Sequence, residues 1–278
     1  MNKTVIYVDK YSAGFFSKLF FILYLLIFSN NTNYIIEAEN FHNDKLFKKH
    51  NYENVEKISN YNNEKNRSGY YNFPYNYTYP NFNNYPYPLS EFKDYNYYIF
   101  CNTKIYSHHL FNELRLLFNE YYNKLIMTEY LINNINEKKK IIKNTNILGV
   151  FLRDPCHYGG INDFLYDYID EIKQIEHKYD KILLISCVKK YNYVFKETFK
   201  NKLIYFTDKE LVEINKDWDY TGSNIEYEYV NVFTEVYIAA KYCNYLIGGS
   251  SNMFIGALII NPTIKFKLFD CLQNKNGL

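Results

Sequence analysis

Residues 241–262, which read KYCNYLIGGSSNMFIGALIINP, combine a short apolar strand, a turn of small residues and the start of a helix. We expect the strand at residues 245–247 and the first helical residue near Ser251 or Asn252. Where a strand end, a glycine turn and a capped helix follow one another, backbone N–H groups point outward and the helix dipole favours negative charge. The stretch therefore predicts an anion site, and a pyrophosphate group is one such anion.

The second half of the chain alternates apolar strands with amphipathic helices. The expected strands lie at residues 147–152, 181–185, 203–206, 245–247 and 264–269. Helical faces lie between them, at residues 161–175, 191–199 and 229–243, and a further helix follows the glycine turn. This alternation predicts an α/β domain in which a doubly wound parallel sheet, with right-handed connections, is covered by helices on both faces.

Ligands of such sheets bind beyond the carboxyl ends of the strands. The residues expected near that edge are Arg153, Ser186, Asp208 and 248–252. Arg153 directly follows a strand, and a guanidinium there can hold a phosphate through two parallel hydrogen bonds. A salt bridge to Asp154 is the alternative role.

The glycine turn supplies a second set of candidate binding residues. Gly249 lets a ligand approach the backbone, while Ser250, Ser251 and Asn252 supply hydrogen-bond donors. The chain contains no GxGxxG motif and no Walker lysine, which disfavours a dinucleotide enzyme and a P-loop ATPase. The turn therefore points to phosphate binding of another kind.

The first half of the chain has a different pattern. It opens with a strand, a turn, a helix and a strand, at residues 5–8, 12–14, 15–28 and 34–37. A polar stretch at about 41–98 follows, and the prolines in it argue against long helices and central strands. We expect an irregular Tyr/Asn/Pro-rich insertion there. Its rings could stack on sugars, although sequence drift in a tolerant loop is the interpretation we favour.

Two helices should connect the halves, one capped by Ser107 and one by Thr128, with the lysines at 138–140 at a solvated helix end. The chain then divides into two domains, at residues 1–145 and 146–278.

The apolar run at residues 15–28 raises the question of a membrane segment. It is shorter than the about 20 residues of a spanning helix and contains Lys18. The polar residues that follow make a poor signal-peptide cleavage site. We therefore expect a buried helix.

Composition narrows the function further. A formal net charge of +2 does not suggest nucleic acid. The cysteines are Cys101, Cys156, Cys187, Cys243 and Cys271, and their number is odd and no CxxC pair occurs. A zinc site or a disulfide framework is therefore disfavoured, and reduced thiols in a cytosol fit better.

Several segments resemble the fucosyltransferase-like glycosyltransferases, of the bacterial and nodulation-factor type with GT-B architecture. Residues 148–153, LGVFLR, resemble the family strand "GVHIRGTD", and residues 244–258, NYLIGGSSNMFIGAL, resemble its later "Dyligg-SnlS-aAl" segment. Residues 12–17, SAGFFS, resemble the "GffS" opening and make Gly14 a further site candidate. Residues 181–186, KILLIS, align with the "kiflaTDd" strand.

The resemblance implies two Rossmann-like domains, an acceptor-side domain at 1–145 and a nucleotide-sugar-binding domain at 146–278. It implies that Arg153 pairs with the pyrophosphate of a GDP-sugar and that Ser250, Ser251 and Asn252 contact the same group. Negative charge develops on the departing diphosphate. A cation and N–H donors beside it would stabilise that charge without a metal, and this would make Arg153 a catalytic residue.

The chain also departs from the family pattern. Phe151 stands where the family has a histidine, residues 186–188 replace its acidic pair, and Pro155-Cys156 stand where Thr-Asp is usual. His157 could replace a missing polar contact or transfer a proton, with a solvated loop histidine as the alternative. We hence consider two functions.

The first is a metal-independent glycosyltransferase that moves a sugar, with fucose as a candidate, from a nucleotide-diphosphate sugar to a glycan acceptor, with no cofactor. The second is a catalytically degenerate relative that binds a nucleotide or a glycan. Either protein is expected in the cytoplasm, with peripheral association at the inner face of the membrane as an alternative.

Overall fold

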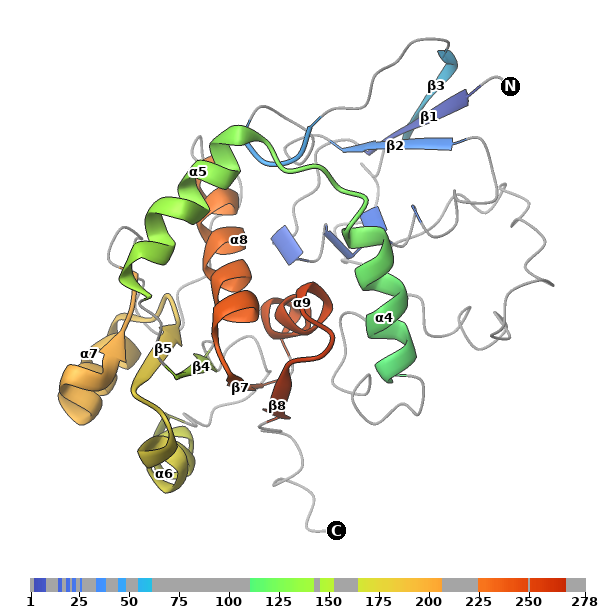
Figure 1. The fold of residues 1–278 in the computed structure, drawn as a ribbon. Coiled ribbons are helices and arrows are strands. Elements are labelled where there is room, and N and C mark those ends of the chain that lie inside the picture. Colours follow the sequence, from blue (N-terminus) through green and yellow to red (C-terminus); the bar gives the residue numbers. More distant parts are fainter. Residues whose placement is uncertain are drawn as a thin grey trace. The chain divides into compact units, whose positions relative to one another are not determined.

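The computed structural model of the 278-residue chain describes residues 3–8, 15–16, 19–20, 22–23, 26, 34–38, 45–48, 55–61, 111–142, 146–152, 165–206, 225–249 and 251–268. The chain divides into two compact units, Met1–Tyr130 and Leu131–Leu278. Each contains a parallel sheet with helices (Figure 1).

The sheet of the first unit has three parallel strands in the order β2-β1-β3. The strands are β1 (Lys3–Val8), β2 (Tyr34–Ala38) and β3 (Val55–Tyr61). The first two were expected from sequence. β3 corrects the expectation of an irregular stretch at 41–98, because it pairs along its length with β1 although its few apolar residues do not alternate.

The apolar run at residues 15–28 is helical wherever the structure describes it, and all of its described residues are buried except the half-buried Leu26. Its buried helical residues are Phe15, Phe16, Leu19, Phe20, Ile22 and Leu23. They recur at the three- and four-residue spacing of one helix face. Among the described parts of the chain, no helix has the length and apolarity that crossing a membrane requires.

The predicted helices between the halves are α4 (Phe111–Tyr122) and α5 (Glu129–Lys138). Phe118 and Tyr121 of α4 are buried. The lysines at the end of α5 differ from the expectation. Lys138 is only 9% exposed and donates a hydrogen bond to Asn231, so only the lysines after it fit a solvated helix end.

The sheet of the second unit has five parallel strands in the order β6-β5-β4-β7-β8. They are β4 (Ile147–Phe151), β5 (Lys181–Ile185), β6 (Leu203–Ile204), β7 (Tyr245–Gly248) and β8 (Lys265–Leu268). Numbered within the unit, the order is 3-2-1-4-5, the arrangement of a Rossmann-type sheet. The expected parallel sheet is thereby confirmed.

Four helices accompany this sheet: α6 (Leu165–Ile175), α7 (Lys189–Phe199), α8 (Ile225–Tyr242) and α9 (Asn252–Ile260). Short 3₁₀ turns follow three helices, at Lys139–Ile141, Glu176–Lys178 and Lys200–Lys202.

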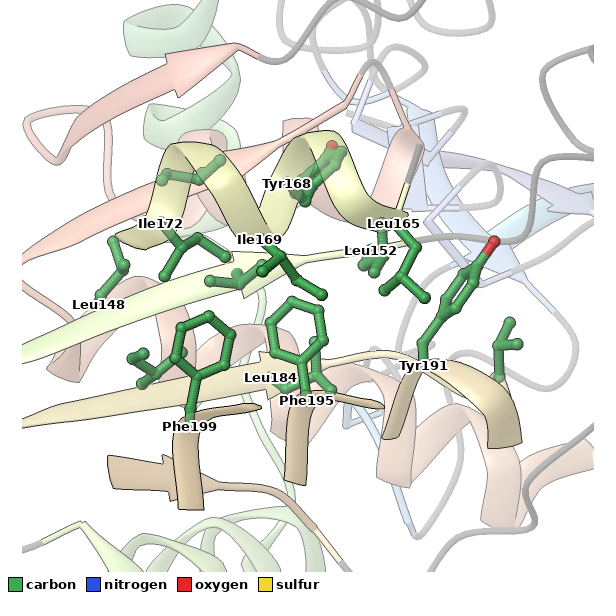
Figure 2. Packing of buried hydrophobic residues seen from close by; sticks show 14 residues of the cluster. Leu148, Leu152, Leu165, Tyr168, Ile169, Ile172, Leu184, Tyr191, Phe195 and Phe199 are labelled. Atoms are coloured by element: carbon green, nitrogen blue, oxygen red, sulfur yellow. The ribbon is translucent and has the colours of Figure 1, made fainter. Parts of the chain in front are cut away.

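One face of the sheet carries α6 and α7. Leu148, Val150 and Leu152 of the β4 segment share a buried cluster with residues of these two helices. Figure 2 shows Ile169 of α6 and Phe195 of α7 pointing toward one another above the strands.

The opposite face carries α8 and α9. Gly149 and Phe151, which alternate along β4 with the residues of that cluster, face α8 and α9. A Cβ on Gly149 would lie 3.0 Å from the Cys243 sulfur, and the Phe151 ring contacts the Phe254 ring of α9. The sheet is therefore wound on both faces, as the sequence predicted.

Reciprocal hydrogen bonds tie the amino ends of the central strands together. Asn146 N–H donates to Asp180 Oδ2 at 2.9 Å, and Asp180 N–H donates to the Asn146 carbonyl at 2.8 Å. Ile147 N–H donates to Asn244 Oδ1 at 2.9 Å, and Asn244 N–H returns a bond to the Ile147 carbonyl at 2.8 Å. These contacts fix the strand register at the edge opposite the predicted site.

Candidate functional site at the carboxyl edge of the second sheet

The strand order places a topological switch point between β4 and β7. From β4 the chain continues to β5 on one side, whereas β7 and β8 extend the sheet on the other. Such a reversal opens a crevice at the carboxyl ends of the two strands, which is where ligands of open α/β sheets bind. Phe151, the last residue of β4, lies opposite Gly248, the last residue of β7.

The glycine turn leads from β7 into α9. Ser251 N–H donates to the Gly249 carbonyl at 2.8 Å, which closes the turn tightly. Ser251 has extended backbone angles, and its Oγ accepts a hydrogen bond from Phe254 N–H at 3.3 Å. Ser251 is therefore the N-cap, and the predicted capped helix start is confirmed. The positive end of the α9 dipole lies at the switch point.

An aromatic group fills the space beside the last strand residue of β7. A Cβ on Gly248 would lie 2.4, 2.7 and 2.8 Å from three ring carbons of Phe254. The Phe254 ring in turn meets Phe151 edge-on at 5.4 Å and Phe266 at 6.1 Å between ring centroids. Glycine is thus required at position 248 because the ring occupies the place of a side chain.

Ser186 lies just beyond β5, the strand next to β4. It is 4% exposed, and its Oγ accepts a hydrogen bond from Val188 N–H at 3.2 Å. Asn192 of α7 donates from Nδ2 to the carbonyls of Ser186 and Val188, at 3.1 and 2.9 Å. Two carbonyl acceptors fix the orientation of this amide, so its Oδ1 faces the other way and is buried, with no hydrogen-bond partner among the residues that the structure describes.

Ser186 and the glycine turn therefore share one edge of the sheet with β4 between them. Their strands, β5 and β7, are two strand spacings apart, which is roughly 10 Å. A nucleoside diphosphate can cover that distance. Gly249, Ser251, Asn252 and Ser186 are the predicted site residues that the structure describes at this edge.

The other residues predicted at the site or near this edge lie outside the described residues: Arg153, His157, Asp208, Ser250 and Gly14. Arg153 follows Leu152, whose N–H donates to the Ile185 carbonyl at 3.1 Å. The hydrogen bonds between β4 and β5 therefore continue up to the residue that precedes this arginine.

The described residues at the carboxyl ends of the three strands β4, β5 and β7, namely 151–152, 185–188 and 248–249, carry no charged side chain. Residues 147–152 and 181–188 contain no acidic or imidazole side chain, and Phe151 is 4% exposed against Phe254. In the described part of the chain, no group of three or more His, Cys, Asp or Glu could hold a metal ion. Beneath the sheet, burial raises the pKa of the Cys243 thiol far above its usual range. The described groups therefore offer backbone and hydroxyl donors.

Sequence reasoning missed two residues of this edge. Phe254 carries a weak signal, an aromatic residue three positions after an N-cap serine, but its contact with Gly248 depends on the tertiary fold. Asn192 lies on the buried side of α7 among apolar residues. A lone amide at an apolar helical position is a signal that sequence alone could have found.

Comparisons with known proteins bear on the fold. No protein-family model matches the sequence, and no curated protein matches it. Among solved structures, NodZ α-1,6-fucosyltransferase soaked with GDP-fucose matches with a TM-score of 0.58 at 12% identity, over 99% of this chain and 97% of that one. The same enzyme co-crystallised with GDP gives a TM-score of 0.57 at 12% identity, over 96% of each chain. Selenomethionine NodZ from Bradyrhizobium gives 0.57 at 12% identity, over 96% and 95%.

These matches cover both units of the chain. The chain therefore has the GT-B-like α/β fold of fucosyltransferases, and the resemblance noted in its sequence is confirmed at the level of the fold.

Proposed function

We propose that the protein is a glycosyltransferase that uses a nucleotide-diphosphate sugar, GDP-linked and with fucose as the first candidate. The observation that carries this proposal is the match over nearly the whole chain to a fucosyltransferase whose crystals were soaked with GDP-fucose. A second support comes from the chain itself, since the capped start of α9 lies at the switch point of the second sheet.

In this proposal the donor diphosphate lies at the carboxyl edge between β4 and β7. The start of α9 offers N–H donors and a positive dipole end to the phosphate oxygens. Arg153 comes two residues after β4, and we assign it the second phosphate contact. Together these groups would stabilise the charge that develops on the departing diphosphate, so the displacement would need no metal.

The acceptor in this proposal is a glycan, bound by the first unit. Stereochemical inversion at the sugar would require a base on the acceptor side, and Glu37 of β2 is one candidate by position in the chain. Asp9 and Glu39 are others, outside the described residues.

A binding protein without catalysis is the second candidate. The observation that favours it is the neutral edge, where Phe151 is buried and the β5 end contributes Ser186 and Cys187 instead of acidic groups. Such a protein would bind the nucleotide through the same turn and leave the glycosidic bond intact.

A thermal-shift series separates these functions. GDP, UDP, CMP and their sugars are each added at the same concentration to the full chain, because a ligand that binds only the native state raises Tm, and a tighter ligand raises it more. We expect GDP and GDP-fucose to raise Tm most. No shift with any nucleotide would refute both candidates, whereas a shift without hydrolysis or transfer over an acceptor panel would favour the binding protein.

A further inference from the structure

We infer that Phe254 is the positioning residue of the anion site, and that its ring fixes the backbone N–H groups of Ser251 and Asn252 at the start of α9. The inference deepens the proposed function and rests on it for the identity of the ligand. Its structural part depends only on the contacts around the ring.

The Phe254 ring leaves no space for a side chain at position 248. Phe254 is fully buried, and its ring lies where a side chain on Gly248 would have to go, with three ring carbons within 2.8 Å of the point that a Cβ would occupy. Strand β7 can therefore approach α9 this closely only because residue 248 has no side chain. The close approach sets the distance from the strand end to the helix start.

Phe254 also joins the ring to the cap through its own backbone. Phe254 N–H donates to Ser251 Oγ at 3.3 Å, and Ile255 N–H donates to the Ser251 carbonyl at 2.9 Å. A shift of the ring moves its own backbone, and the N-cap bond moves with it. The position of the cap therefore depends on the packing of the ring.

The Phe254 ring is held from both sides by aromatic side chains. Phe151 at the end of β4 and Phe266 in β8 each meet it edge-on, and their strands flank β7 in the sheet. Edge-to-face aromatic pairs stabilise a ring beyond the burial of its area. Three strands thus define where α9 begins, and the donor groups are in place before any ligand arrives.

The test replaces Phe254 by Leu and compares it with Phe195→Leu. Phe195 is equally buried but packs in α7 on the opposite face of the sheet, so the control loses a similar amount of packing away from the turn. Two readouts are measured in the full chain: the Kd for GDP by calorimetry, and amide hydrogen exchange in peptides that contain the N–H groups of Ser251 and Ile255.

We expect Phe254→Leu to weaken GDP binding about tenfold and to accelerate exchange at the turn by a similar factor. Phe195→Leu should lower Tm comparably and leave both readouts within about twofold of wild type. Unchanged readouts in a folded Phe254→Leu protein would overturn the inference, and so would equal losses in both variants.

Two further outcomes remain decisive. If Phe254→Leu does not fold, Phe151→Leu removes one of the flanking rings and is judged by the same criteria. If the wild-type protein does not bind GDP, the proposed function fails, and hydrogen exchange alone still decides whether Phe254 positions the turn.

Discussion

Lys138 at the end of α5 donates a 2.8 Å hydrogen bond from Nζ to Oδ1 of Asn231 in α8, which lies 93 residues later in the chain. The ammonium also lies 5.5 Å from the ring centroid of Phe206. Both contacts belong to the second unit; the hydrogen bond joins the last residue of α5 to α8, and the ring contact joins it to the segment after β6.

Replacing Lys138 by Ala should therefore lower the free energy of unfolding by about 1–3 kcal/mol, because the buried Asn231 acceptor loses its donor. Lys140→Ala is the matched control. Lys140 pairs with Glu137 at 2.6 Å on an exposed surface, so its loss should stay within about 0.5 kcal/mol. Urea titration measures both values, and equal effects would contradict the assigned role of Lys138.

Gly248→Ala should destabilise the protein by about 1–3 kcal/mol, because the new methyl group overlaps the Phe254 ring. Gly149→Ala is a useful comparison. Its Cβ would lie 2.5 Å from Leu246 Cδ2, the movable end of a side chain, so a smaller loss is expected. Calorimetry with GDP should show weakened binding only for Gly248→Ala, and a normal affinity in that variant would count against a site at the turn.

Arg153→Ala should reduce sugar transfer at least about a hundredfold if this guanidinium stabilises the departing diphosphate. Arg153→Lys should recover little of the activity, since an ammonium cannot make the paired hydrogen bonds of a guanidinium. Circular dichroism checks that both variants are folded, and Lys196→Ala, an exposed position on α7, controls for the loss of one charge. Wild-type turnover in Arg153→Ala would refute the assignment.

The buried Cys243 thiol should make the free energy of unfolding depend on pH. Burial raises the pKa of its thiol in the folded protein, so above about pH 8.5 the unfolded chain releases a proton that the folded chain keeps. The stabilising contribution is complete below that pH and falls as pH rises, with a slope that approaches about 1.4 kcal/mol per pH unit.

Cys243→Ala should remove this slope between pH 8 and pH 9.5. Tyr179 and Tyr237 also have pKa values raised by burial, but they titrate at higher pH and are present in both proteins. Parallel stability curves for wild type and Cys243→Ala over this interval would contradict the prediction.

The second sheet could be predicted from sequence because its strands are continuous apolar runs. Residues 147–152 and 181–185 are buried almost throughout, and such runs between amphipathic helices permit few alternatives. The helix start at Ser251 was predictable for a local reason, since a cap depends on its immediate neighbours.

The features that sequence did not predict depend on residues distant in the chain. β3 is a strand because it pairs with β1, and its own apolar pattern is weak. The burial of Lys138 depends on Asn231, and the need for glycine at 248 depends on where the Phe254 ring lies. Each is set by tertiary packing that local propensity does not encode.

The two edge strands of the second sheet, β6 and β8, affect the tendency of the protein to self-associate. β6 has only two residues, so it offers few backbone groups to another strand. At the other end, β8 carries the exposed lysines Lys265 and Lys267, the second held 2.6 Å from Glu171. Short edges and edge lysines oppose strand-to-strand aggregation. Both margins of the second sheet thus discourage one copy from adding to the sheet of the next, even at high protein concentration.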